Sequence, residues 1–241
     1  NSQQPKAGNQ NLPDSLPPPF ATKSVVNSSK VIGWPEGKTP IAPAGFSVTR
    51  FADDIDHPRW IYVSDEGDIF VAESNTRSRA KSGNRITMFR DANKDGKFES
   101  RHVFKEGLNQ PLGMLILNNK FYIANTDGLY QYDYKPGMTS LQGEGTRIVE
   151  LPAGGYNNHW TRNIITNRSK DKIYISVGSG SNVAEHGIEY ETRRACILEV
   201  NPDGSGERIY ASGLRNPVGM DWAPGTNTLW TAVNERDGLG D

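Results

Sequence analysis

The sequence has a single cysteine and no long apolar run, and both shortages limit what the protein can be. Cys196 stands alone among 241 residues, so the chain can form neither an internal disulfide nor a metal site built from cysteines. Within "ACILEV" we interpret it as a buried structural thiol and not as a nucleophile. No stretch approaches the roughly 18 consecutive apolar residues of a membrane-spanning helix. We therefore expect no membrane span.

An excess of charge of one sign is also missing. Lys and Arg number 27 against 28 for Asp and Glu, which gives a formal net charge of -1. Nucleic-acid binding depends on clustered basic side chains, and the sequence has no basic run. We therefore expect no nucleic-acid partner. Helical spacing of apolar residues is absent after residue 45, and this favours an all-β protein.

Proline is concentrated near the beginning of the chain. Eight of the 15 prolines lie within residues 1–45, in stretches such as "NLPDSLPPPF" and "KTPIAPAGF". This density predicts a Pro-rich, extended N-terminal tether over 1–45, followed by a folded domain over 46–241. Because the sequence starts at Asn1 without Met, we expect a processed, exported chain. The expected compartment is the periplasm or the outside of the cell, with a lipoprotein anchored upstream of Asn1 as a variant.

Four related stretches recur after residue 45. Each has one or two polar residues, an apolar run, a turn and a second β-rich run: "HPRWIYVSDEGDIFVAE", "QPLGMLILNNKFYIAN", "HWTRNIITNRSKDKIYISVGSG" and "NPVGMDWAPGTNTLWTAVNE". Counted from His57, Gln110, Asn158 and Asn216, the repeats start 53, 48 and 58 residues apart, with further strand-like runs between them. Four short strands per ~50 residues are typical of a β-propeller blade. We predict a propeller of which about four blades are present; an all-β sandwich leaves the matched turns unexplained.

The propeller predicts where a ligand would bind. In an antiparallel four-stranded blade, the loop leading into the first strand and the loop between the second and third strands open on one face. Ligand sites of propellers usually lie there, around the central channel. The polar candidates in these loops are Glu73, Asn75, Arg77, Asn158, His159, Ser179, Asn182, Arg215, Asn216 and Glu235. His159 is the candidate general base, and Arg215 is the candidate stabiliser of a developing oxyanion.

The segment "DANKDGKFES" is similar to a calcium-binding loop. Asp91, Asn93, Asp95 and Gly96 occupy positions 1, 3, 5 and 6, but position 12 is His102 where an EF-hand needs a bidentate glutamate. We interpret the segment as the hairpin between the third and fourth strands of the first blade, on the face opposite the channel entrance. Weak calcium binding by the 91–99 loop stays open as an alternative.

Four motifs resemble one enzyme family. "NNHWTRNI", "YISVGSGSN", "ILEVNPDGSGERIYASGLRNPVGMDW" and "LWTAVNERDGLGD" are similar to the sorbosone dehydrogenase branch of the PQQ-dependent sugar dehydrogenases. The resemblance covers roughly residues 45–241, and the last three motifs are specific in their order and spacing. It implies a six-bladed propeller, PQQ on the channel face, and a calcium ion that bridges protein and quinone. The implied reaction is oxidation of an aldose or related sugar aldehyde.

The resemblance also implies roles for residues. His159 takes the proton of the anomeric hydroxyl, Arg215 stabilises the reduced quinone's oxygen, and Asn216 is a neighbouring cofactor contact. Main-chain carbonyls of Arg236 and Asp237 hold the calcium. The other loop candidates divide between the cofactor (Ser179, Asn182 and Glu235) and the substrate (Glu73, Asn75, Arg77 and Asn158).

One position departs from the soluble glucose dehydrogenases, which carry an acid that orients the catalytic histidine. Ser179 stands there, as in the sorbosone-like branch, so glucose is a weaker expectation than dehydrogenation. Six blades of ~50 residues need more than 241 residues, so we expect further blades to complete the pocket. The expected partners are a small sugar and an electron acceptor, either a quinone or a cytochrome.

Two other functions remain open at this stage. A non-catalytic propeller could bind carbohydrate or protein through the same face. A calcium-dependent lactonase would need acidic side chains from several blades at a channel metal, and Glu73, Asp127 and Glu235 are the available acids.

Overall fold

The computed structural model describes residues 18, 20–25, 30, 32–75 and 82–235. The chain divides into two compact units, one of Trp34–Glu235 and one of Asn1–Gly33 with Arg236–Asp241. The described residues of the second unit form no helix or strand. All the regular structure described below belongs to the Trp34–Glu235 unit.

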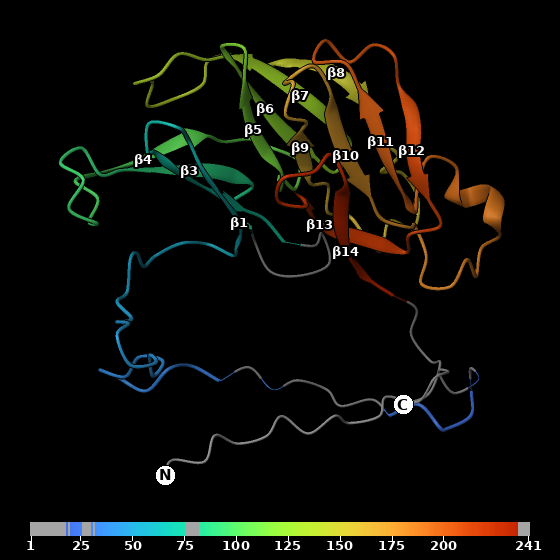
Figure 1. The fold of residues 1–241 in the computed structure, drawn as a ribbon, viewed down its shortest axis with the longest axis horizontal. Helices are drawn as coiled ribbons and strands as arrows, with labels where there is room; N and C mark the ends of the chain where they lie inside the picture. The colour runs from blue at the N-terminus through green and yellow to red at the C-terminus, as the bar shows by residue number, and fades with distance from the viewer. Residues whose placement is uncertain (1–17, 19, 26–29, 31, 76–81, 236–241) are drawn as a thin grey trace. The chain divides into compact units, whose positions relative to one another are not determined.

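The first two sheets each contain four antiparallel strands in sequence order. The first sheet consists of β1 (Pro58–Val63), β2 (Ile69–Glu73), β3 (Arg85–Arg90) and β4 (Ser100–Lys105). The second consists of β5 (Met114–Leu117), β6 (Lys120–Asn125), β7 (Gly128–Asp133) and β8 (Thr146–Glu150). Their arrangement one after the other is visible in Figure 1.

The third sheet repeats this order and the fourth is partial in the described residues. The third consists of β9 (Ile164–Thr166), β10 (Ile173–Val177), β11 (Cys196–Val200) and β12 (Arg208–Ser212). The fourth pairs β13 (Asn216–Trp222) with β14 (Leu229–Asn234). One short 3-10 helix, η1 (Ile188–Glu191), lies between β10 and β11 and is the coiled ribbon in Figure 1. The all-β propeller predicted from the repeat is confirmed.

Neighbouring blades meet through their first strands and the residues just before them. The Gly113 N–H donates to the Arg162 carbonyl at 2.9 Å, and the Asn163 side chain donates to the Val218 carbonyl at 2.8 Å. A Cβ atom at Gly113 would lie 2.7 Å from the Ile164 nitrogen, so this approach of two backbones requires glycine. The first strands therefore stand side by side along the propeller axis.

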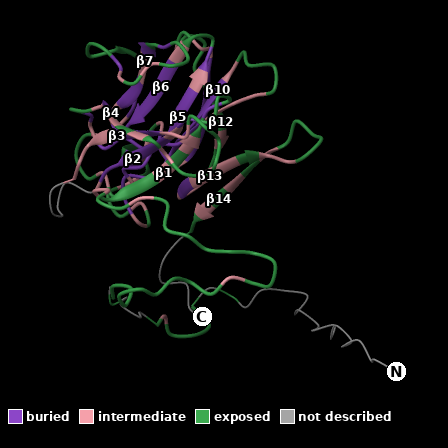
Figure 2. Cartoon of the chain, turned by 90° about the vertical axis from the view of Figure 1, so that its left-hand side faces the viewer, coloured by how far each residue is buried: buried purple, intermediate pink, exposed green. Residues whose placement is uncertain are grey.

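Apolar side chains fill the spaces between facing blades. One core joins blades 1 and 2 through Phe70, Phe104 and Phe121, and the other joins blades 2 and 3 through residues such as Tyr122 and Leu198. Figure 2 shows the resulting contrast between the buried β6 and β10 and the more exposed β1 and β14. Inner strands such as β10 and β11 are buried along their whole length, because both faces of a blade pack against its neighbours.

Two local expectations can be compared with the structure. Cys196 is buried, and burial raises the pKa of its thiol to about 11, as befits a structural residue. The 91–99 segment is the hairpin between β3 and β4, as predicted. Carboxylate oxygens of Asp91, Asp95 and Glu99 lie within 4.8 Å of one another there. Glu99 was not among the predicted calcium ligands, because the EF-hand pattern places its carboxylate at position 12, which is His102.

Candidate active site

The two kinds of loop that the propeller predicts on one face do lie together. In blade 1 the Ser74 N–H donates to the His57 carbonyl at 3.1 Å. In blade 3 the Asn158 N–H donates to the Gly180 carbonyl at 2.9 Å. Between blades 3 and 4 the Ser179 N–H donates to the Arg215 carbonyl at 2.7 Å. The loops carrying His159, Ser179 and Arg215 therefore form one cluster.

The imidazole of His159 is oriented by Ser179. Its Nδ1 lies 2.8 Å from the Ser179 hydroxyl and 3.0 Å from the Ser179 carbonyl. The same hydroxyl donates its only proton to the Ser181 carbonyl at 2.6 Å. Both groups facing Nδ1 must therefore accept, so the proton of the neutral ring lies on Nδ1. Nε2 then carries the lone pair that a general base needs.

A carboxylate binds the two residues that follow Ser179. Glu191, at the end of η1, accepts hydrogen bonds from the Gly180 N–H at 2.7 Å and the Ser181 N–H at 3.1 Å. The Ser181 hydroxyl donates to it as well. Glu191 was not predicted from the sequence, because it lies twelve residues after Ser179 and reaches the loop only through the fold.

The Arg162 side chain binds the backbone carbonyl of His159. The guanidinium is fully buried, and it donates to the His159 carbonyl at 2.7 Å and the Pro152 carbonyl at 2.8 Å. Burial, together with the charge of Arg194, lowers the pKa of Arg162 to about 9, so it remains a cation at neutral pH. Arg162 was not predicted from the sequence. The only signal there was an arginine three residues after His159, directly before the β-rich "NII" run.

Arg215 is fixed by neutral acceptors from two loops. Its Nε donates to the Asn182 carbonyl at 2.8 Å, and its Nη2 to the Asn182 side-chain oxygen at 2.8 Å. Its Nη1 donates to the Asn234 and Glu235 carbonyls at 3.2 and 2.7 Å. Asn158 donates to the same Asn182 side-chain oxygen at 2.6 Å. Four of the residues predicted for the site, Asn158, Asn182, Arg215 and Glu235, are thus in one network.

Gly178 lets His159 and Asn216 approach each other. A Cβ atom at Gly178 would lie 2.5 Å from the Cβ of His159 and 2.6 Å from the Asn216 side-chain oxygen. That oxygen is buried and has no hydrogen-bond partner within the described part of the chain. A buried acceptor of this kind requires a donor, which a ligand or water would supply.

The remaining predicted residues lie elsewhere or outside the described residues. Arg77, Arg236 and Asp237 are not among the described residues. The Asn75 carbonyl accepts from the Gln110 side chain at 2.8 Å, between blades 1 and 2. Asn75 therefore belongs to the blade 1 part of this face.

Glu73 has a structural position. Its side chain is fully buried, and it accepts from Arg85 Nε at 2.9 Å, from Arg85 Nη2 at 2.7 Å and from the Asp56 N–H at 2.6 Å. Thr87 also donates to it. Because the fold already uses both carboxylate oxygens, we leave Glu73 out of the substrate contacts proposed below.

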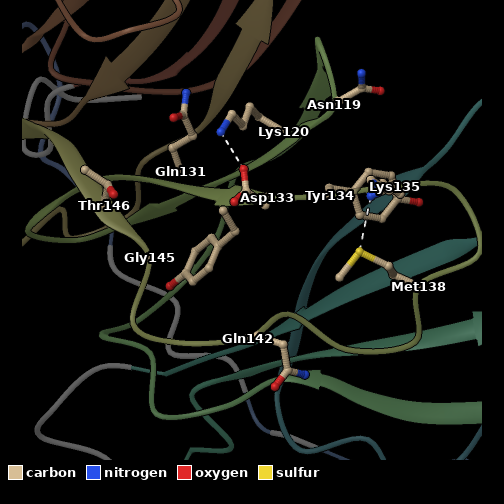
Figure 3. A pocket seen from close by; sticks show the side chains of 11 residues that line it. Asn119, Lys120, Gln131, Asp133, Tyr134, Lys135, Met138, Gln142, Gly145 and Thr146 are labelled. Atoms are coloured by element: carbon tan, nitrogen blue, oxygen red, sulfur yellow. Dashed lines mark hydrogen bonds and ion pairs between the residues drawn. The ribbon is translucent and has the colours of Figure 1, made fainter.

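A hollow of about 610 Å³ lies at the end of blade 2 where β6 begins and β7 ends (Figure 3). Lys120, the first residue of β6, and Asp133, the last residue of β7, line it and form an ion pair of 2.5 Å. Since the loop between β6 and β7 opens at the opposite end, this hollow lies away from the His159 cluster. It contains none of the predicted site residues.

The fold is a β-propeller with a cluster of polar loops on one face. The TrAA12-like family matches residues 40–240, so the chain belongs to that family. A protein from Borreliella burgdorferi, described only as uncharacterized, is 26% identical over 218 residues, covering 83% of this chain and 50% of that protein. This chain therefore spans half the length of that relative.

Solved structures share the fold. The calcium structure of the Trichoderma reesei family AA12 enzyme has a TM-score of 0.68 at 15% identity, covering 82% of this chain and 51% of that one. The holo form of the pyranose dehydrogenase PQQ domain from Coprinopsis cinerea has a TM-score of 0.63 at 21% identity, covering 76% and 45%. The PQQ-bound aldose sugar dehydrogenase from Streptomyces coelicolor has a TM-score of 0.58 at 18% identity, covering 81% and 64%.

None of the helices in the described residues could cross a membrane.

Replacing Glu191 should loosen the loop that orients His159. In Glu191→Ala, the Gly180 and Ser181 amides lose a charged acceptor, and we expect their hydrogen exchange to accelerate about tenfold or more. Amide exchange followed by NMR measures this. Glu189→Ala, on the same short helix, is the control and should leave both amides unchanged. Equal exchange in the two variants would contradict the role of Glu191.

Glu73→Gln should destabilise the fold in a pH-dependent way. Burial alone would raise the pKa of Glu73, but bonds from Arg85, Thr87 and the Asp56 N–H outweigh burial and hold the pKa below its usual value of 4.5. Ionised Glu73 therefore stabilises the protein above about pH 4.5, and this contribution is lost as the pH falls through the lowered folded pKa. We expect a loss of about 3 kcal/mol at pH 7 that shrinks toward pH 3.

Urea denaturation at both pH values provides the measurement. Glu150→Gln is the matched control, because its carboxylate is 74% exposed and lies 3.8 Å from Arg147. It should change the free energy of unfolding by less than about 1 kcal/mol. A Glu73→Gln loss that stays constant from pH 7 to pH 3 would show that the ionised carboxylate is not its source.

Proposed function

We propose that the protein is a calcium- and PQQ-dependent dehydrogenase that oxidises an aldose or related sugar aldehyde, with sorbosone-like sugars as the first candidates. The observation that supports this most is the arrangement of His159, whose Nδ1 proton faces Ser179 and whose Nε2 is the basic atom. Arg215 lies in the same loop cluster. Two of the proteins with a similar fold are a pyranose dehydrogenase PQQ domain in its holo form and an aldose sugar dehydrogenase in its PQQ-bound form.

The residues of the cluster suit an anionic quinone. Arg215 provides a cation held by Asn182, and such a rigid guanidinium binds oxygen anions well. The buried side-chain oxygen of Asn216 has no partner in the described residues, and as an acceptor it would take a hydrogen bond from an N–H or O–H group of the bound cofactor. Calcium would be held by main-chain carbonyls of Arg236 and Asp237, since calcium accepts carbonyl oxygens and leaves positions for a ligand. The fit of the cluster thus favours the cofactor.

The chain's own groups would then act as the general base, hold the base in place, and balance the negative charge of the reduced cofactor. Bound PQQ would supply the hydride acceptor for the anomeric carbon of the sugar. His159 would remove the proton of the anomeric hydroxyl through Nε2, while Ser179 keeps the ring in place. Arg215 would place positive charge where the oxygen of the reduced cofactor gains electrons. Asn158, Asn75 and Arg77 would contact the sugar.

We further propose the setting of this reaction. The ring would have six blades, with residues of the remaining blades completing the pocket, and a quinone or a cytochrome would accept the electrons. The enzyme would work in the periplasm or outside the cell, where a lipid anchor is a variant. A lactonase is less well supported, because the Glu73 carboxylate is already bound by Arg85.

His159→Ala should abolish sugar oxidation and leave cofactor binding largely intact. Loss of a general base lowers turnover about 10²- to 10⁴-fold. The test uses the full-length protein reconstituted with PQQ and calcium, with dye reduction over a panel of aldoses and fluorescence quenching for PQQ affinity. His57→Ala is the control, because His57 is at the corresponding place in blade 1 and pairs with Asp56 at 2.7 Å. Unchanged turnover in His159→Ala, or no turnover in the wild type with any sugar, would overturn the proposal.

Removal of calcium should stop the reaction reversibly. Chelation is expected to lower turnover at least tenfold, and added calcium should restore it, whereas magnesium should restore it poorly because it demands a stricter octahedral geometry. Because the 91–99 loop carries a separate acidic cluster, the variant Asp95→Asn serves as control. Its turnover should respond to chelation as in the wild type; chelation-resistant turnover in the wild type would contradict a calcium role.

A further inference from the structure

A second hollow, of about 370 Å³, adjoins the loop that orients His159. Its wall includes the Gly180 and Ser181 segment, whose neighbours Ser179 and Asn182 contact His159 and Arg215. The rest of the wall comes from the 154–156 segment and from the 186–194 segment around η1. The hollow and the candidate active site therefore share one loop.

Aromatic side chains line this hollow and remain uncovered. Tyr156 is 50% exposed and Tyr190 is 68% exposed, although both lie in a concave wall. The ring of His186 meets that of Tyr156 edge-on, with centroids 5.0 Å apart and an interplanar angle of 84°. An aromatic group held in this way offers a preformed apolar surface, and such surfaces in concave sites usually serve a ligand.

Polar groups of both signs complete the hollow. Arg194 is buried, and it donates to the Asn157 side chain at 2.7 Å and to the Gly154 carbonyl at 3.4 Å. These bonds use two of its five N–H donors and fix the guanidinium plane. Burial lowers the pKa of Arg194, and the negative charge of Glu191 opposes that shift. Because the opposite charges of Arg194 and Glu191 lie in the same wall, the hollow favours a neutral ligand over an anion.

We propose that this hollow is a second saccharide subsite, which binds a neutral sugar ring against Tyr156 and Tyr190. A sugar ring combines apolar C–H faces with hydroxyls on its rim, and the hollow combines aromatic surface with Arg194 and backbone polar groups. The ring would be the unit of an oligosaccharide that does not react, while the reacting end lies at His159. This second part rests on the proposed dehydrogenase function, whereas binding of a sugar in the hollow does not.

Methyl glycosides of disaccharides test the binding separately from catalysis. Methyl cellobioside, methyl maltoside and methyl lactoside lack a free anomeric hydroxyl and cannot be oxidised there. We expect at least one of them to bind the wild-type protein in titration calorimetry. Tyr190→Ala and Tyr156→Ala should each weaken that binding about five- to tenfold.

Ile188→Ala is the matched control, because Ile188 is 77% exposed on the same short helix and does not line the hollow. Its affinity should equal that of the wild type. Amide exchange of Gly180 in the tyrosine variants checks that the shared loop is intact. Failure of all three glycosides to bind, equal binding by the tyrosine variants, or binding of uronic acids in place of neutral sugars would each overturn the subsite.

Kinetics decide the link to the proposed reaction. In the protein loaded with PQQ and calcium, the tyrosine variants should raise KM for reducing disaccharides about five- to tenfold and leave KM for monosaccharides unchanged. Equal effects on both substrates would overturn the oligosaccharide part. Tyrosine-dependent binding of methyl glycosides without turnover of any sugar would retain the subsite and reject the dehydrogenase, so the two failures are distinguishable.

Discussion

The position of one proton governs the candidate active site. The Ser179 hydroxyl gives its proton to the Ser181 carbonyl, so the same oxygen can only accept from His159. If this loop rearranged, the hydroxyl could donate to Nδ1, and the basic nitrogen of the ring would change. The bonds from Gly180 and Ser181 to Glu191 therefore matter for chemistry as well as for stability, because they fix the shape of the loop. A carboxylate can thus orient a histidine indirectly, through backbone and a neutral hydroxyl.

The loop can keep this shape because the blades hold it from both sides. Its Ser179 N–H reaches blade 4 at the Arg215 carbonyl, and Arg162 secures the chain around His159 within blade 3. Among the described residues, the outer blades have more exposed apolar side chains. Ile61 on β1 is 63% exposed and Trp230 on β14 is 68% exposed. In a closed propeller these apolar faces would meet neighbouring blades, so ring closure and the rigidity of the site depend on the same kind of contact.

The sequence predicted what is local and periodic. Alternating strands and matched turns located the blades, and equivalent places in the repeat pointed to His159 and Arg215. Glu191 and Arg162 could not be predicted from the sequence, because their roles arise only when the fold brings η1 and the chain before β9 to the site. Glu73 shows the converse: its place in the repeat suggested a ligand contact, but the sequence does not reveal that Arg85 and Thr87 enclose its carboxylate. Pattern gives position along the chain, whereas hydrogen-bond partners depend on packing.

A shared wall between two subsites has an energetic consequence. Binding energy from the part of a substrate that does not react can hold the reacting part in place, and this raises the rate only if the two sites are rigidly connected. Here the connection is a segment of four residues, Ser179 to Asn182, whose ends contact His159 and Arg215 and whose middle lines the Tyr190 hollow. Glu191 takes part in both subsites, since it lines the hollow and its carboxylate binds the backbone of the loop. A sugar ring in the hollow would therefore press on the same hydrogen bonds that orient the base.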